Sequence, residues 1–232
     1  MRPVLITACV LLACSPPPPA SPGKHLGDGA WKRPDGSAGE PAAPLRGEVT
    51  LSIVGTNDLH GALERLPLFA GFVANLRAAR AADGGGVVLI DGGDLFQGTL
   101  ESNLAEGADV VRAYNYIGYA AVAVGNHEFD YGPEGPAVIA ATSTDDPRGA
   151  LKARAREAKF PFVVSNIMDA ATGARIAWPN MPARTLVEVA GVKVGIIGAS
   201  TESTPYTTMP ANFAGLRMAP PAPAITAGPS GP

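Results

Sequence analysis

The chain has 232 residues, a formal net charge of −3 and 46% apolar residues, which is enough for one sizeable hydrophobic core. Because its charges are nearly balanced, we do not expect nucleic acid or an anionic membrane surface as a partner. Its two cysteines, Cys9 and Cys14, both lie near the N-terminus. The rest of the sequence therefore has neither a disulfide nor a thiolate metal site, and any metal must be held by oxygen and imidazole.

The first 14 residues are typical of an export signal. Arg2 supplies a positive charge, and residues 4–13 form an apolar run that is too short to span a bilayer. The run Leu11-Leu12-Ala13-Cys14 resembles the lipobox of bacterial lipoproteins. We therefore expect a lipoprotein-type signal peptide over residues 1–14, with lipid attached to Cys14. The alternative is a plain secretory signal, which would make the protein periplasmic or secreted.

Residues 15–47 are rich in proline, glycine, alanine and serine and are predicted to form a disordered tether. His25 lies in this stretch, and we expect it to be solvated and inert. Residues 48–217 are predicted to form the folded domain. Residues 218–232 consist mainly of alanine, proline and glycine and are predicted to form a tail that cannot continue a strand or a regular helix.

Within the domain, apolar runs alternate with helical periodicity. This alternation predicts an α/β fold with helices on the faces of a sheet, and a hairpin near the end of the domain implies some antiparallel pairing. The expected strands span residues 49–54, 87–91, 120–124, 160–165, 185–189 and 192–197. The expected helices span residues 66–82, about 110–117 and about 147–159, and a turn is expected over residues 169–173.

Polar side chains follow three of these expected strands. Asp58 and His60 follow the first strand, Asp94 follows the second after two glycines, and Asn126 and His127 follow the third. Open α/β sheets bind ligands outside the carboxyl ends of their strands. We therefore expect these five side chains to converge at one rim of the sheet.

The residue types suit a hard or borderline metal ion. Asp58 and His60 are two positions apart, and on an extended chain they would point to the same side and could share a cation. Asp94 has two oxygens that can bridge two ions. Asp91 is a rival ligand, but it still lies in the strand and can hold the loop instead. Taken singly, Asp-x-His and Gly-Asp are also common in surface turns and helix caps.

The third cluster adds a histidine–aspartate pair. Asn126 offers a neutral amide oxygen as a ligand, and the adjacent His127 points elsewhere. Asp130, three residues on, can accept a proton from one ring nitrogen of His127, so that the other nitrogen faces a substrate. The alternative is a capped turn histidine without a chemical role.

Residues 55–61, 91–99 and 125–132 resemble the motifs of calcineurin-type metallophosphoesterases, and more narrowly those of the exported 5′-nucleotidase branch. The likeness extends over about residues 48–216. It implies the four-layer metallophosphoesterase fold, in which a β-sheet sandwich is flanked by helices, here incomplete at its C-terminal end. It also implies hydrolysis of a small-molecule phosphate ester, with a nucleotide favoured.

The resemblance further implies two divalent metal ions, with Zn²⁺ or Mn²⁺ favoured. Asp58 and His60 would hold the first ion, Asp94 would bridge the two, and Asn126 would bind the second and help to orient the phosphate. Such paired ions neutralise the charge that develops during in-line displacement.

The same resemblance gives His127 a role in substrate binding and catalysis. Held by Asp130, it would stabilise the transition state or protonate the leaving oxygen.

The sequence departs from the family pattern in one respect. The family completes its site with a later histidine and a Gly-His-x-His or Gly-His-x-Gln segment, followed by a nucleobase-binding domain, and nothing here matches these. We therefore expect a truncated enzyme with little or no turnover, anchored in the cell envelope by lipid only. The alternatives are a non-catalytic envelope lipoprotein with a vestigial fold and a relative that acts on another phosphate or sulfur ester. The sequence sets no oligomeric state.

Overall fold

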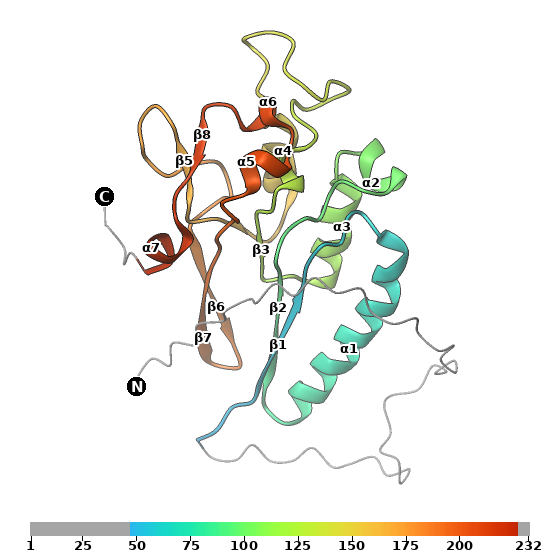
Figure 1. The fold of residues 1–232 in the computed structure, drawn as a ribbon. Helices are drawn as coiled ribbons and strands as arrows, with labels where there is room; N and C mark the ends of the chain where they lie inside the picture. Colours follow the sequence, from blue (N-terminus) through green and yellow to red (C-terminus); the bar gives the residue numbers. More distant parts are fainter. Residues whose placement is uncertain (1–46, 227–232) are drawn as a thin grey trace.

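The computed structural model describes residues 47–226. Its centre is a parallel sheet of four strands in the order β1-β2-β3-β4, of which Figure 1 labels the first three. The expected signal peptide, the tether, Cys14 and His25 lie outside the described residues. The strands are β1 (Leu51–Thr56), β2 (Gly86–Asp91), β3 (Ala121–Ala123) and β4 (Phe162–Val163).

Three helices connect successive strands of this sheet: α1 (Leu66–Ala82), α3 (Ala108–Ile117) and α4 (Gly149–Glu157). Because sequential parallel strands are joined by right-handed crossovers, these helices share one face of the sheet. In accord with this, α1 contacts β2 and α3, and α3 contacts α4. The α/β class with a parallel sheet is thus confirmed. No helix among residues 47–226 combines the length and apolar character needed to cross a bilayer.

The core lies between the sheet and these helices. Tyr114 of α3 stacks on Tyr119 with ring centroids 3.8 Å apart, and Phe160 packs against both rings. Val73 of α1 and Leu89 of β2 are also fully buried. Burying a side chain of this kind contributes about 1.5–3 kcal/mol, so this cluster fixes the helices on the sheet.

The opposite face is covered in part by the antiparallel hairpin of β6 (Arg184–Val189) and β7 (Val192–Ile197), and β6 contacts β2. Figure 1 shows this hairpin on the side of the sheet away from α1 and α3. Ala190 and Gly191 both have positive φ, 51° and 75°, as a type I′ turn requires. A second antiparallel pair joins β5 (Ile167–Asp169) and β8 (Leu216–Met218).

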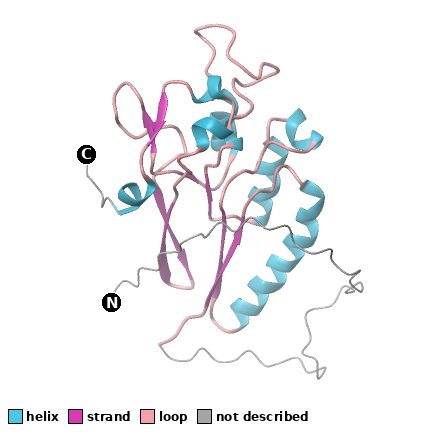
Figure 2. Ribbon diagram, viewed as in Figure 1, coloured by secondary structure: helices cyan, strands magenta, loops and turns pink. Residues whose placement is uncertain are grey.

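Several short elements were not expected from the sequence. They are α2 (Leu100–Leu104), α5 (Thr204–Thr207), α6 (Pro210–Phe213), and 3₁₀ turns over Leu63–Arg65 and His127–Phe129. The loop over residues 131–148, between the second of these turns and α4, has no helix or strand (Figure 2).

The predicted absence of regular structure after residue 217 was wrong. Met218 belongs to β8, and Pro221–Thr226 form a helix, α7. Its two prolines stand in the first turn of the helix, where the backbone N–H of any residue lacks an intrahelical acceptor. Proline therefore costs no hydrogen bond there.

Candidate metal centre

The loops that follow β1 and β2 run side by side beyond the end of the sheet. The N–H of Asp58 donates to the carbonyl of Gly93 at 3.0 Å, and the N–H of His60 donates to that of Asp94 at 3.0 Å. The N–H of Gly61 then donates to Leu95 O at 2.8 Å. This pairing brings the first two polar clusters of the sequence together.

Three of the expected site residues have left-handed backbones: Asp58 with φ 52°, His60 with φ 47° and Asp94 with φ 60°. The extended geometry expected for Asp58 and His60 was therefore wrong, although Asp58 Oδ1 still lies 3.8 Å from His60 Nε2. A left-handed backbone costs a non-glycine residue roughly 1–2 kcal/mol. Such strain is typical of functional sites, where the surrounding structure holds it in place.

His60, Asp94 and His127 form a cluster in which each residue offers one potential ligand atom, and these atoms all lie within 4.8 Å of one another. The two imidazole rings meet edge to face with centroids 4.7 Å apart. His60 Nδ1 lies 2.9 Å from the carbonyl of Gln97. Because a carbonyl only accepts, Nδ1 carries the proton and Nε2 is left with a lone pair for a cation.

His127 is held at both its backbone and its ring. Its N–H donates to Asp94 Oδ1 at 2.9 Å, and Nδ1 lies 2.6 Å from Asp130 Oδ2. The expected histidine–aspartate geometry is therefore present, and Nε2 is the ring nitrogen that this contact leaves free. Thr208, which the sequence did not suggest, donates to the other oxygen of Asp130 at 2.9 Å.

Asn126 lies at the same rim of the sheet and is oriented from a distant segment. Its Nδ2 donates to the carbonyl of Thr207 at 2.9 Å. The amide oxygen, which is the atom that can bind a metal, accepts no hydrogen bond from residues 47–226. The carboxylate of Asp58 lies beside His60 but outside the cluster of His60, Asp94 and His127. Its side chain is 49% exposed and contacts Nδ2 of Asn57.

Glu128 ties the second and third clusters together, a role that the sequence did not reveal. It is buried, and its carboxylate accepts from the N–H groups of Gly125 at 2.6 Å, Leu95 at 2.7 Å and Asp94 at 3.0 Å. Burial, aided by the charge of Asp94, raises the pKa of Glu128 to about 8. The residue type alone could not show that this carboxyl is directed into the protein.

Asp91 takes the structural role that the sequence left open for it. Its carboxylate accepts from Thr56 Oγ1 at 2.5 Å, the Gly93 N–H at 2.7 Å and the Tyr114 hydroxyl at 2.9 Å. Burial raises its pKa to about 6, against the opposing effect of these hydrogen bonds. Because Asp91 is occupied in this way, Asp94 is the residue of the second cluster that can bind a cation.

The free donor atoms suit a divalent metal. They are carboxylate, imidazole and amide atoms, which fit several first-row divalent ions, among them Zn²⁺, Mn²⁺, Co²⁺ and Fe²⁺. Two glycines allow the loops after β2 and β3 to lie close together. A Cβ on Gly93 would lie 2.7 Å from Gly125 N, and a Cβ on Gly125 would collide with Asp94 Oδ1.

Comparison with known proteins gives the family. Residues 51–157 match the model of the calcineurin-like phosphoesterases. The chain carries a domain of this family, whose members are metal-dependent hydrolases.

Curated relatives narrow the resemblance to nucleotidases. The chain is 33% identical over 179 residues to protein UshA of Salmonella pullorum, covering 74% of this chain and 29% of the relative. It is 32% identical over 190 residues to a 5′-nucleotidase of Vibrio cholerae, covering 78% and 31%. A snake venom 5′-nucleotidase of Gloydius brevicauda is 30% identical, with 74% and 29% covered. The chain thus spans about three tenths of the length of these relatives.

Solved structures agree on the fold. A 5′-nucleotidase precursor of Thermus thermophilus superposes with a TM-score of 0.55 at 28% identity, covering 75% of this chain and 33% of the other. The sulfate thiohydrolase SoxB of the same organism gives a TM-score of 0.60 at 16% identity, covering 77% and 40%. The second likeness concerns the fold alone.

Proposed function

We propose that this chain carries the metal-binding part of an exported phosphoesterase that hydrolyses small phosphate esters, with nucleotides as the favoured substrates. The observation that carries the proposal is the convergence of His60, Asp94 and His127, with Asn126 beside them, at the carboxyl end of a parallel sheet. The nucleotidases among the relatives support the choice of substrate.

In this proposal, His60 Nε2 and Asp94 hold a divalent ion, with Asp58 beside them. The amide oxygen of Asn126 and a shared Asp94 serve a second ion. Divalent ions at such sites act as Lewis acids toward phosphoryl oxygens. His127 keeps its Nε2 for the phosphoryl group or the leaving oxygen, because Asp130 fixes its ring through Nδ1.

The charge of the site explains why cations are needed. Asp58, Asp94 and Asp130 lie around it, and none of the site residues described above is lysine or arginine. A phosphate ester dianion would be repelled by this set of carboxylates. Binding of AMP should therefore depend on added metal.

Isothermal titration tests the proposal without relying on turnover. AMP should bind in the presence of Zn²⁺ or Mn²⁺ and not in their absence. His60→Gln and Asp94→Asn should weaken metal binding at least about tenfold. His127→Gln should retain the metal but weaken AMP binding. His25→Gln, which changes a histidine expected in the tether, is the matched control.

Two results would contradict the proposal. One is metal binding that His60→Gln and Asp94→Asn leave unchanged, because the ion would then lie elsewhere. The other is AMP binding of equal strength with and without metal. If His127→Gln lost the metal, His127 would have to be a metal ligand and not a substrate-binding group.

We further propose that the protein is exported and anchored in the cell envelope through lipid on Cys14, which lies outside the described residues. Support comes from the run that ends at Cys14 and from the four prolines over residues 16–19, which would form a stiff spacer. Cells labelled with a fatty acid should incorporate it into the wild type and into Cys9→Ser, but not into Cys14→Ser. Equal labelling of all three proteins would rule out this anchor.

A further inference from the structure

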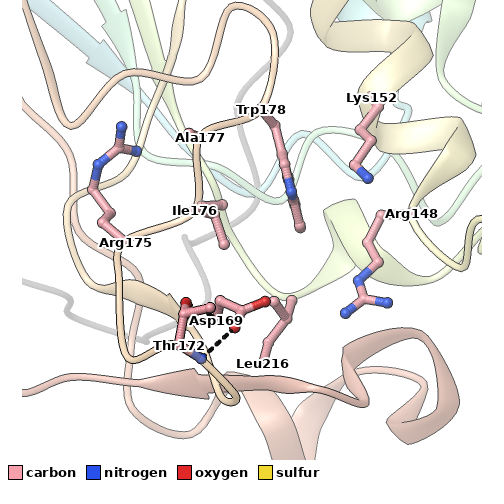
Figure 3. A pocket seen from close by; sticks show the side chains of 9 residues that line it. All are labelled: Arg148, Lys152, Asp169, Thr172, Arg175, Ile176, Ala177, Trp178 and Leu216. Carbon is pink, nitrogen blue, oxygen red and sulfur yellow. Dashed lines mark hydrogen bonds between the residues drawn. The ribbon is translucent and has the colours of Figure 1, made fainter.

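A cavity lies apart from the residues of the candidate metal centre. Its volume is about 420 Å³, within the range of small-molecule sites. It is formed by the start of α4, the end of β5, β8 and the segment around Trp178 (Figure 3). None of its lining residues belongs to the metal centre.

The indole of Trp178 forms the main apolar wall. Lys152 Nζ lies 4.6 Å and Arg148 Cζ lies 6.0 Å from its ring centroid. Figure 3 shows both cationic side chains on one side of the ring and Ile176 on the other. Leu216 of β8 also lines the cavity. The wall therefore offers a flat apolar surface next to positive charge.

Two of the cations are already engaged. Lys152 Nζ pairs with Asp146 Oδ2 at 2.6 Å. Arg175 donates to the carbonyl of Met181 at 3.0 Å, and Figure 3 shows its guanidinium directed away from the other side chains. These two residues serve the protein itself, which leaves Arg148 as the cation available to a ligand.

Arg148 retains hydrogen-bonding capacity. Its Nη2 donates to the carbonyl of Ala214 at 2.6 Å. Its Nε is buried without a partner, and Nη1 makes no hydrogen bond to any other residue in the described range. Burial lowers the pKa of Arg148, while the charges of Asp146 and, to a smaller extent, of Asp169 oppose this change. The guanidinium is therefore a half-buried cation whose donors are only partly used.

Asp169 provides the complementary acceptor. Its Oδ1 accepts from Ala171 N, Thr172 N and Thr172 Oγ1 at 2.8–3.1 Å, and Oδ2 has no hydrogen-bond donor among residues 47–226. These bonds, the backbone N–H of Thr172 foremost, lower the pKa of Asp169, and Arg148 adds to the effect. Each charge thus acts on the other, yet the two form no direct ion pair. Opposite charges that line one cavity without touching leave room for a bridging group.

We propose that this cavity binds a small zwitterion with an apolar or aromatic side chain, of the α-amino acid class. Its carboxylate would be held by Arg148, its ammonium group by Asp169 Oδ2, and its side chain against Trp178 and Leu216. Arginine and carboxylate form strong charge-assisted bonds of the kind that this arrangement offers. A ligand with only a negative charge would be repelled by Asp169, and a ligand with only a positive charge would be repelled by Arg148.

Tryptophan fluorescence can test the proposal, because Trp31 and Trp178 are the two tryptophans in the sequence. With Trp31→Phe as the parent protein, L-phenylalanine should change the emission of Trp178 saturably. The probes 3-phenylpropionate, which lacks the ammonium group, and phenethylamine, which lacks the carboxylate, should bind at least tenfold more weakly. Chelation of metal should leave all three results unchanged, which separates this site from the metal centre.

Variants complete the test. Arg148→Met and Asp169→Asn should each weaken phenylalanine binding about tenfold or more, while the controls Arg65→Met and Asp109→Asn, at positions that do not line the cavity, should not. If Arg148→Met does not fold, Asp169→Asn and the three probe ligands still test the proposal. Three results would overturn the proposal: no saturable signal, equal affinity for 3-phenylpropionate, or binding that Asp169→Asn leaves unchanged.

Discussion

The hydroxyl of Thr208 donates to Asp130 Oδ1 at 2.9 Å across 78 positions of sequence. The other oxygen of Asp130 lies 2.6 Å from His127 Nδ1, so a side chain from the segment after α5 fixes the imidazole of the candidate site. The preceding residue, Thr207, orients Asn126 through its carbonyl. Two adjacent residues far along the chain therefore set the directions of two site side chains.

Replacing Thr208 by valine should test this support. The variant keeps the shape but loses the donor, so Asp130 and the ring of His127 should become less ordered. We expect metal-dependent AMP binding to weaken about tenfold, in line with the cost of losing a group that orients a metal-site histidine. Thr208→Ser should restore binding, and exposed Thr142→Val is the control. Unchanged AMP affinity in Thr208→Val would show that His127 needs no such support.

Asp91 should make stability depend on pH. Its pKa rises from 3.8 to about 6 on folding, mainly because it is buried. The folded protein therefore binds this proton more tightly, and the resulting stability is fully present below pH 3.8 and lost as the pH rises through about 6. Asp91→Asn cannot titrate, and its amide can still satisfy Thr56, Tyr114 and Gly93.

The measurement is the free energy of unfolding in urea between pH 4 and 7 for both proteins. The wild type should gain roughly 2 kcal/mol relative to Asp91→Asn as the pH falls across this range. A difference between the two proteins that stays constant with pH would contradict the shift in pKa.

Gly93 should tolerate no side chain. Its φ is 102°, and a Cβ would lie 2.7 Å from the backbone nitrogen of Gly125. Gly93→Ala should lower the free energy of unfolding by about 1 kcal/mol for the left-handed backbone and by a further 1–3 kcal/mol, roughly, for the steric overlap. It should also reduce metal affinity, because Asp94 would move.

Gly135→Ala is the matched control. Gly135 has a similar φ of 110°, and nothing lies within 4 Å of the position that its Cβ would occupy. This variant should show the backbone cost alone, with metal affinity unchanged. If both variants lose equal stability, the contact between the two loops is not tight.

Turnover of the 232-residue chain should be low. The sequence contains three histidines in all, and two of them, His60 and His127, stand at the site. In the proposed site, the described residues would supply most of the ligands of one ion and only part of those of a second. Each lost electrostatic contact costs about 10²–10³ in rate. Release of phosphate from AMP with Zn²⁺ or Mn²⁺ should therefore be barely above background, and rapid release would show that this ligand set is sufficient.

The sequence predicted best where one local pattern decided the outcome. The helical spacing of apolar residues over 66–82 predicted α1 with its observed bounds. The apolar run that ends at Asp91 predicted β2. The proximity of His127 and Asp130 was also predictable, because three positions bring them together within one turn.

The remainder depended on contacts between distant segments. Thr208 meets Asp130 only after β6, β7 and α5 have folded back over the sheet. The burial of Glu128 follows from the meeting of two loops, which neither loop encodes alone. The left-handed backbones of Asp58 and His60 likewise depend on the pairing of their loop with the one after β2.

Those left-handed backbones also limit how the site could be engineered. Asp58, His60 and Asp94 hold conformations that their own residue types disfavour, so the frame of β1 and β2 maintains the shape of both loops. A short peptide that copied these loops would relax to other conformations. Transplanting the motif into another scaffold would therefore require two adjacent parallel strands with the same register, and the motif residues alone would not recreate the site.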